Sequence, residues 1–530
     1  MYPKICSEAV GGEGGIQEFV SALDKGDLHI ERTREDWMKK TLIASWIVVL
    51  AVYFGIYFFF FGQEWSLDEI SYGQFMAHIQ EKRRPLVMGI LPSEEVNALK
   101  PLQKPRREIR DFEFASLLQS PKKTSRPAYT KEEIDEDIDV MFDLFENFYA
   151  AYTMFGGRET FDEVQQKIKS QVTGNMSRSE LSQIIVKELK VFADGHMHFE
   201  GRDVYENDNI FMAEGVFIGK KEEEFYLREE SGVYRIEEPD EIRPYLKHTI
   251  DEKGRLSYAL VGKVSIEKDH SQVLPLEVSI SDRFGKQRGL KLEWKLLGGG
   301  YRGGAPYLSE ETKNGVLIQR NTRVYEDSVS YETLRSEFEQ YGQRASAQPA
   351  MILDLRGNPG GSVELIVLWS KAFLKAETSK NMVVGVDKSQ YRHVEMFREH
   401  HTEEELKAIF NDGWKTLGEM GGWTVQPKNI LILSDKDVAS SGEKLIFLLR
   451  QMDKTLVIGT PTAGVSFCVN PVDFYLPNTG SHLRFGLHLY FSEKISDDSE
   501  SAIEPDLWVD PQVSEERTLK FMKYYKIGKR

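Results

Sequence analysis

The longest run of hydrophobic positions lies near the N-terminus. Residues 42–61 (LIASWIVVLAVYFGIYFFFF) contain no charged side chain, and a helix of this length spans the ~30 Å hydrocarbon core of a bilayer. Basic residues crowd the preceding side and acidic residues follow the run, so the N-terminal tail is expected inside and the rest of the chain outside. The pattern predicts a single-pass helix in the cell membrane, with residues 1–41 as a cytoplasmic tail. A buried core helix is the alternative.

The next segment has no such run. Residues 62–129 carry polar, basic and proline-bearing stretches such as KPRR and SPKKTSRP. That composition is typical of a stalk or a linker between a membrane and a domain.

From residue 130 the apolar positions acquire a helical period. They recur at steps of three or four between acidic residues, which indicates an amphipathic helix. These positions are Ile134, Ile138, Met141, Phe145 and Phe148. Similar patterns follow near 161–171 and 179–192. We therefore expect an N-terminal helical cap over residues 130–205.

The remaining chain divides into a β-rich and a mixed part. Residues 206–300 contain short alternating runs such as GVYRI and RLSYALVGKV between turn formers, which predict a small β-rich module. Residues 301–515 alternate apolar runs (AMILDL, NILILS, TLVIG) with helical patterns, so an α/β domain is expected. The stretch 376–428 is expected as a lid or rim over a cleft, and residues 516–530 as a C-terminal tail.

Charge and cysteine content exclude some classes of protein. The formal net charge of −16 argues against a nucleic-acid-binding protein, which normally presents a basic face. The two cysteines, Cys6 and Cys468, are too few for a disulfide framework or a four-thiolate zinc site. In the predicted topology they lie on opposite sides of the membrane and cannot pair.

The first segment with candidate chemistry is DLRGNPGG, residues 354–361, directly after the apolar run AMIL. Glycines after a strand free backbone N–H groups and let a substrate backbone approach closely. The segment lacks the Gly-Lys-Ser/Thr ending of a phosphate-binding loop, which argues against a nucleotide site. A plain turn is the alternative.

The second segment contains Ser440 and Ser441, where a polar turn after NILILS passes into a predicted helix. N–H groups at such a helix start carry positive dipole character and can stabilise an oxyanion. Serine is also a common helix cap, and the turn lacks the Gly-x-Ser-x-Gly sequence of α/β hydrolases. A nucleophile and a helix cap therefore both remain open.

The third segment is FADGHMHFEG, residues 192–201. An imidazole has a pKa near neutrality, so His196 is a candidate general base. His196 and His198 could instead bind a metal, but such a site is expected after an apolar strand, and the preceding segment looks helical. A structural histidine is the remaining alternative.

Together, in this order, the three segments resemble peptidase family S41, which includes the carboxy-terminal processing proteases and the tricorn protease core. The resemblance covers about residues 130–515, and its specific parts are DLRGNPGG and the Ser-x-Gly-Glu helix start. It implies an α/β fold with a crotonase/ClpP-like ββα core. The β-rich module stands where relatives carry a PDZ domain, which binds peptide C-termini by strand addition. A degenerate PDZ-like domain and an unrelated β insertion both remain open.

The resemblance also implies the nucleophile and the base. The family nucleophile lies three positions before the acidic residue that opens the helix, which gives Ser440 when counted back from Glu443. Val465 occupies the place of the lysine that one branch uses as its base. His196 matches the Asp-Gly-His of the tricorn-like branch and is the expected base.

Three further positions complete the expected site. The backbone N–H groups of Ser441 and of Gly360 (or Gly361) are expected to hold the oxyanion. Glu500 is expected to orient the imidazole. Asp498 and Glu504 are its rivals, because the strictly aligned position is Ser499.

These roles predict a membrane-anchored, extracytoplasmic serine peptidase that cleaves peptide or protein substrates through an acyl-enzyme. No metal, cofactor, ATP or nucleic-acid partner is expected. The first alternative is a catalytically inactive relative that only binds peptides. The second is a metal-dependent hydrolase built on His196 and His198.

Overall fold

The structure is a computed structural model. It describes residues 70–83, 105–120, 126–205, 207–229, 232–298, 307–324, 328–374, 386–388, 414–416, 428–450, 452–465, 468–489 and 502–528. The chain divides into two units, Met1–Ser66 and Leu67–Arg530, and the described residues all belong to the second. Among the described helices, none is long and apolar enough to cross a bilayer. The predicted anchor at 42–61 lies outside the described residues and stays a prediction.

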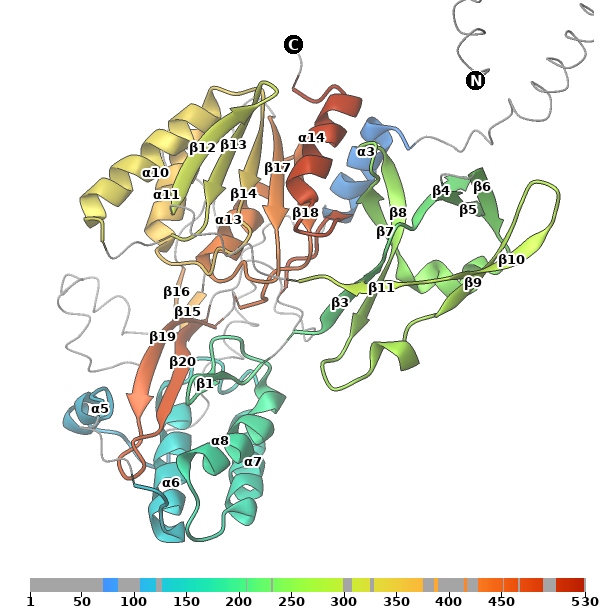
Figure 1. The fold of residues 1–530 in the computed structure, drawn as a ribbon. Helices are drawn as coiled ribbons and strands as arrows, with labels where there is room; N and C mark the ends of the chain where they lie inside the picture. Colours follow the sequence, from blue (N-terminus) through green and yellow to red (C-terminus); the bar gives the residue numbers. More distant parts are fainter. Residues whose placement is uncertain are drawn as a thin grey trace, which may run out of the picture. The chain divides into compact units, whose positions relative to one another are not determined.

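A six-stranded sheet carries the segments predicted as α/β (Figure 1). In spatial order its strands are β12 (Leu308–Lys313), β13 (Val316–Asn321), β14 (Ala350–Asp354), β17 (Asn429–Ser434), β18 (Thr455–Gly459) and β21 (Leu507–Trp508). β12 and β13 pair antiparallel, and every later pair is parallel. β14 and β18 are buried along their whole length, as expected for parallel strands covered on both faces. The α/β prediction is confirmed.

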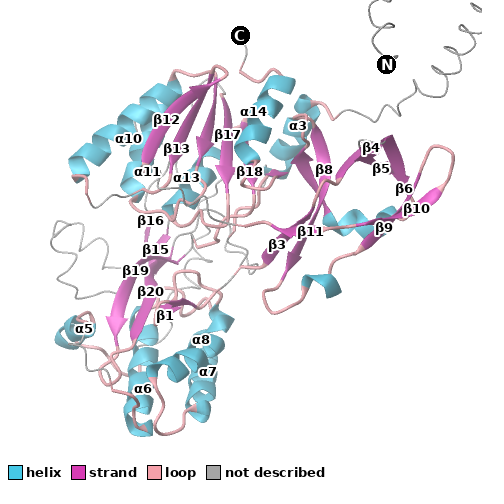
Figure 2. Ribbon diagram, viewed as in Figure 1, coloured by secondary structure: helices cyan, strands magenta, loops and turns pink. Residues whose placement is uncertain are grey.

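Helices cover both faces of this sheet (Figure 2). On one face α10 (Tyr331–Ser346), α11 (Val363–Leu374) and α13 (Ser441–Arg450) share a hydrophobic core with the strands. On the other face α3 (Tyr72–Arg83) and α14 (Ser514–Tyr524) share a second core. Met351 and Leu353 of β14 belong to the first core and Ile352 to the second, because successive side chains of a strand point to opposite faces.

Two segments expected as loose chain are instead helices packed on the sheet. Helix α3 lies within the predicted stalk, 62–129, and buries Phe75 and Ile79. Helix α14 overlaps the predicted tail, 516–530, and buries Phe521. Both segments are polar in composition, but their few apolar residues face one core. The expectations of a loosely folded stalk and tail are therefore corrected over these residues.

A separate hydrophobic core joins helices to a hairpin far away in the sequence. The helices are α5 (Asp111–Leu117), α6 (Lys131–Phe148), α7 (Gly157–Gln171) and α8 (Arg178–Leu189), with the 3-10 turn η2 (Lys190–Phe192) after them. The strands are β19 (Cys468–Tyr475), β20 (His482–Leu489), β1 (His198–Phe199) and β2 (Arg202–Asp203), paired in that order. Helices α6, α7 and α8 lie where the periodicity predicted them, and their role as a cap stays a prediction.

The segment predicted as β-rich contributes a nine-stranded sheet. Its strands are β3 (Asn209–Ala213), β4 (Phe217–Lys221), β5 (Glu224–Glu229), β6 (Gly232–Ile236), β7 (Leu246–Ile250), β8 (Leu256–Val264), β9 (Glu277–Ser281), β10 (Gln287–Lys291) and β11 (Trp294–Leu296). Short helical turns interrupt it at α9 (Pro239–Ile242), η3 (Arg243–Tyr245) and η4 (His270–Gln272). A PDZ-like identity for this sheet stays a prediction. Of the expected lid, 376–428, the structure describes the antiparallel pair β15 (Val386–Lys388) and β16 (Trp414–Thr416) and the final residue.

Candidate active site

Ser440 ends the loop that connects β17 to α13. Its φ is 51°, in the left-handed region that a residue with a Cβ rarely adopts. Hydrogen bonds hold this conformation from both sides. The Ser440 N–H donates to Glu443 Oε2 at 3.1 Å, and the Lys444 N–H donates to the Ser440 carbonyl at 3.1 Å. Strained backbone of this kind clusters at functional sites.

Ser440 does not have the geometry of an ordinary helix cap. Thr130 and Ser177, which do cap helices, have φ of −72° and −77°, and their hydroxyls accept an N–H three residues later. In both caps a glutamate three residues later also accepts from the N–H of the cap residue, which makes a reciprocal capping box. At Ser440 only this glutamate hydrogen bond is present, and the hydroxyl has no hydrogen-bond partner among the residues that the structure describes. Ser440 is also partly exposed, whereas Ser441 is fully buried. Both points favour Ser440 over Ser441 as the nucleophile.

Two backbone amides beside Ser440 are suited to an oxyanion. The N–H groups of Ser441 and Gly361 donate to no acceptor within the described part of the chain. The Gly360 N–H, in contrast, donates to Asn358 Oδ1 at 2.8 Å. The expectation that Gly360 supplies an oxyanion donor is therefore corrected, and Gly361, the alternative, has the available amide.

Gly360 instead allows two loops to approach closely. A Cβ on Gly360 would lie 2.8 Å from the Cβ of Ser440 and 3.0 Å from the nitrogen of Ser441. Any side chain at position 360 would therefore collide with the nucleophile loop.

His196 lies in the turn between η2 and β1. Its backbone N–H donates to Asp194 Oδ1 at 2.8 Å, and the Tyr149 hydroxyl donates to Asp194 Oδ2 at 2.9 Å. Asp194 is fully buried, and burial raises its pKa to about 6. Ala193 has a φ of 39°, so strained backbone also occurs beside the candidate base. Asp194 thus fixes the backbone of this segment.

The loop that ends at Val465 connects the histidine segment to the serine. The Val465 N–H donates to Glu443 Oε2 at 3.0 Å, and this is the same oxygen that accepts from Ser440. The Val465 side chain packs on Gly195, because a Cβ on Gly195 would lie 1.8 Å from Val465 Cγ1. A chain of direct contacts therefore runs from Ser440 to the neighbour of His196. The roles of Ser440 as nucleophile and of His196 as base stay a prediction.

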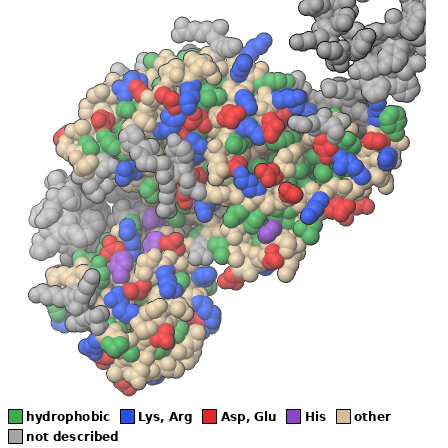
Figure 3. Space-filling model, viewed as in Figure 1, with side chains coloured by type: hydrophobic (Ala, Val, Ile, Leu, Met, Phe, Trp, Pro, Cys, Tyr) green, Lys and Arg blue, Asp and Glu red, His purple; other side chains and the backbone are tan. Residues whose placement is uncertain are grey.

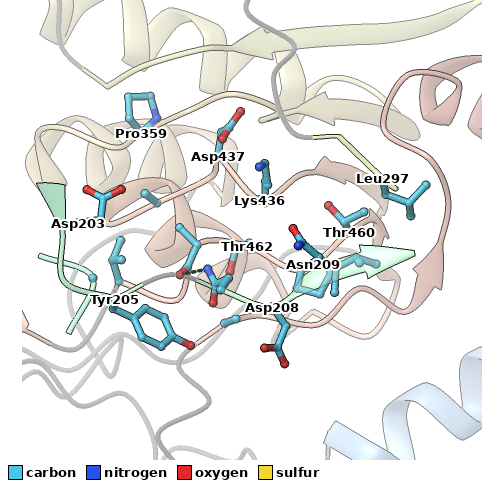
Figure 4. A pocket seen from close by; sticks show the side chains of 18 of the residues that line it. Asp203, Tyr205, Asp208, Asn209, Leu297, Pro359, Lys436, Asp437, Thr460 and Thr462 are labelled. Carbon is cyan, nitrogen blue, oxygen red and sulfur yellow. Dashed lines mark hydrogen bonds between the residues drawn. The ribbon is translucent and has the colours of Figure 1, made fainter. Parts of the chain in front are cut away.

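A cavity of about 1010 Å³ lies beside these residues (Figure 4). His196, Ala439 and Val465 line it from the candidate site, and Lys263 and Leu296 line it from the β-rich module. In Figure 3 histidine side chains gather on one part of the visible surface. A cavity of this size accommodates several side chains of an extended peptide.

The imidazole of His196 is in the form that a general base needs. Burial lowers the pKa of His196 to about 4, and the charge of a protonated His198 and the charges of Arg484 and Lys444 lower it too, while a hydrogen bond with the Cys468 backbone raises it. The ring is therefore neutral at pH 7 and can accept a proton. Its Nδ1 atom is buried and has no hydrogen-bond partner among the described residues.

The acid that orients this ring is not placed. Glu500 and Asp498 both lie outside the described residues. Glu504 is described, and Lys263 Nζ lies 2.6 Å from its Oε1. Glu504 is therefore engaged by a lysine of the β-rich module.

His198 has a carboxylate partner of its own, since its Nδ1 lies 2.8 Å from Asp203 Oδ1. Both residues line the cavity. Within the described residues there is no group of three or more histidine, cysteine, aspartate or glutamate side chains that could hold a metal ion. The metal-dependent alternative thus lacks a third ligand in this part of the chain.

Sequence reasoning gave Glu443 no role beyond locating Ser440. The Ser-x-x-Glu spacing from 440 to 443 is that of a capping box, and this signal predicts the contact with the Ser440 N–H. No local pattern predicts that the same carboxylate reaches Val465. Asp194 and Tyr149 were missed for the same reason, because their contact joins two separate segments.

Comparison with known proteins gives a family for part of this chain. The model of peptidase family S41 matches residues 321–509, which include Ser440 and Glu443 but not His196. Among solved structures, mature CPAF is similar over 75% of this chain and 96% of its own, with 15% identity and a TM-score of 0.38. The photosystem II D1 C-terminal processing protease is similar over 72% and 94%, with 13% identity and a TM-score of 0.34.

A lipoprotein from Streptococcus agalactiae is similar over 76% of this chain and 99% of its own, with 11% identity and a TM-score of 0.33. No curated protein sequence matches the chain. The family model covers the parallel strands β14, β17, β18 and β21, the glycine segment and the helix that follows the candidate nucleophile. The part of this chain at residues 321–509 therefore belongs to peptidase family S41.

Proposed function

We propose that this protein is a serine peptidase that cleaves peptide or protein substrates through an acyl-enzyme formed on Ser440. The observation that carries the proposal is the conformation of Ser440, which is left-handed and partly exposed at the start of α13. Its hydroxyl has no partner among the described residues and is free to attack a carbonyl. The predicted anchor at 42–61 would hold the reaction at the extracytoplasmic face of the membrane.

The reaction would proceed in two acyl-transfer steps. The neutral His196 imidazole takes the hydroxyl proton as the Ser440 oxygen attacks the peptide carbonyl. The N–H groups of Ser441 and Gly361 donate hydrogen bonds to the former carbonyl oxygen and stabilise its negative charge. His196 then gives the proton to the leaving amine, and a water molecule repeats the sequence on the acyl-enzyme. Glu500 is the proposed acid that orients His196.

An active-serine probe tests this proposal. A fluorophosphonate should label the purified chain at one site, because it phosphonylates a serine that a neighbouring base activates. Peptide mass spectrometry should place the adduct on Ser440, and a chelator should not prevent it. Absence of labelling and of turnover over a peptide library would favour the inactive peptide-binding relative. Turnover that a chelator abolishes would favour a metal-dependent hydrolase.

Gly360→Ala should lower kcat by about 10²- to 10³-fold. The new Cβ would lie 2.8 Å from the Ser440 Cβ and 2.9 Å from the Ala439 carbonyl oxygen, so Ser440 has to move, and a displacement of about 1 Å costs about 10²-fold in rate. Steady-state kinetics on a peptide substrate measures the effect. Gly315→Ala is the matched control, because its φ is also positive, at +77°, but its Cβ would meet no atom within 4 Å. A kcat for Gly360→Ala within tenfold of the control would contradict the prediction.

A further inference from the structure

The Glu443 carboxylate is a buried acceptor of four hydrogen bonds. It lies in the first turn of α13 and is fully buried. Its Oε1 accepts from the Thr462 hydroxyl at 2.6 Å and from the Gly464 N–H at 2.7 Å. Its Oε2 accepts from the Val465 N–H at 3.0 Å and from the Ser440 N–H at 3.1 Å. An ionised carboxylate has about four lone-pair sites, so these donors fill its capacity.

The four donors belong to two different segments. Ser440 is the last residue before α13, whereas the other three donors lie in the loop that follows β18. Thr462 of this loop is itself fixed, because its hydroxyl accepts from the Ile503 N–H at 2.8 Å and its N–H donates to the Ile503 carbonyl at 3.2 Å. The carboxylate therefore joins the nucleophile to a loop that is anchored independently.

One oxygen atom of this carboxylate connects the nucleophile loop to the histidine segment through two hydrogen bonds and one packing contact. Oε2 accepts from Ser440 and from Val465, and the Val465 side chain packs against Gly195, the neighbour of His196. A shift of Oε2 would therefore move Ser440 and the histidine segment relative to each other.

We propose that Glu443 is a positioning residue of the active site. Its carboxylate holds Ser440 in the left-handed conformation and holds Val465 against the histidine segment, so that the serine oxygen and the imidazole meet. This inference rests on the proposed function.

Two other glutamates make the same helix-start contact without reaching a second segment. Glu133 and Glu180 accept from the N–H of their cap residues, Thr130 and Ser177. Hydrogen bonds at these solvent-accessible positions lower the pKa values of both. Burial instead raises the pKa of Glu443 to about 7, against four hydrogen bonds that lower it. A carboxylate that keeps its place at this electrostatic cost is typical of a functional site.

The negative charge is essential to this arrangement. All four neighbours are donors, and none of them is ionisable. In Glu443→Gln an NH₂ group replaces one carboxylate oxygen. At the Oε2 position it faces two backbone N–H groups, and at the Oε1 position it faces the Gly464 N–H and the Thr462 hydroxyl, so at least one backbone N–H loses its acceptor in either amide orientation. A protonated Glu443 has the same defect, because its O–H also faces at least one backbone N–H.

Glu443→Gln tests the inference against a matched buried carboxylate. Asp137 of α6 is also fully buried, and it accepts from the Asn478 N–H, the Thr479 N–H and the Thr479 hydroxyl, away from the cavity. At pH 8 we expect Glu443→Gln to lower kcat and the rate of fluorophosphonate labelling about 100-fold, with KM within about threefold. Asp137→Asn should lower the melting temperature but leave kcat at the wild-type level.

The pH profile gives a second measurement that does not depend on how well the variant folds. Wild-type labelling should slow about 100-fold as the pH falls through about 7, where Glu443 gains a proton. In the histidine segment, Asp194 and His196 titrate at about 6 and about 4, and burial lowers the pKa of His198 from its ordinary value. Equal labelling rates for Glu443→Gln and wild type, or an equal loss of kcat in Asp137→Asn, would overturn the inference. If the wild-type chain is not labelled at all, the proposed function fails instead.

Discussion

Ser440→Ala should lower kcat by about 10⁴- to 10⁶-fold, which is the loss expected when a serine nucleophile is removed and oxyanion stabilisation remains. The fold should be unaffected, because the Ser440 hydroxyl bonds to no described residue and alanine has the same Cβ in the left-handed region. Affinity for a peptide substrate should also persist. Kinetics, thermal melting and calorimetric titration of a peptide onto the variant measure the three quantities separately.

A serine with no expected chemical role provides the control. Ser346, in the last turn of α10, is buried, and its hydroxyl has no hydrogen-bond partner among the described residues. Ser346→Ala should therefore keep the wild-type kcat. Turnover by Ser440→Ala within tenfold of this control would show that the nucleophile is another residue, and retained fluorophosphonate labelling would help to locate it.

The sequence predicted the three central parallel strands because local composition defines them. The run AMIL, residues 350–353, is apolar over its whole length, and such a run suits a strand buried on both faces. Helices α3 and α14 were missed because their apolar residues are sparse. Phe75 and Phe521 become core residues only when the sheet provides a face for them to cover. Tertiary contacts, rather than local period, decide the structure of these two segments.

The candidate site also has features that local sequence predicts and features that depend on tertiary contacts. The polar turn that holds Ser440 and Ser441 could be read from neighbouring positions, but the choice of Ser440 as the expected nucleophile came from the family resemblance. The failure of Gly360 as an oxyanion donor was also predictable, because an asparagine side chain often accepts the N–H two residues later, as Asn358 does. The contacts that connect the histidine segment to the serine loop were not predictable from local pattern. They depend on Val465 and Glu443, which lie in segments far from residue 196 in the sequence.

His196→Ala should lower kcat/KM by about 10³- to 10⁴-fold, because this change removes the proposed base for the Ser440 proton. The wild-type profile should fall in two steps as the pH decreases. The first step, near pH 7, follows protonation of Glu443, and the second, near pH 4, follows protonation of His196, whose pKa burial depresses. In His196→Ala the lower step should disappear from the residual activity, and the upper step should remain. A pH series of kcat/KM for both proteins measures this difference.

A variant of His248 distinguishes the effect of removing a buried imidazole from the effect of removing the base. His248 lies on β7 in contact with the rings of Phe75 and Tyr258, and burial lowers its pKa to about 4 as well, but it does not line the cavity. His248→Gln should therefore change stability and leave kcat/KM and both pH steps intact. If His196→Ala retains activity within tenfold of this control while His198→Ala loses it, the base is His198. Asp203, already 2.8 Å from its Nδ1, would then be the acid that orients it.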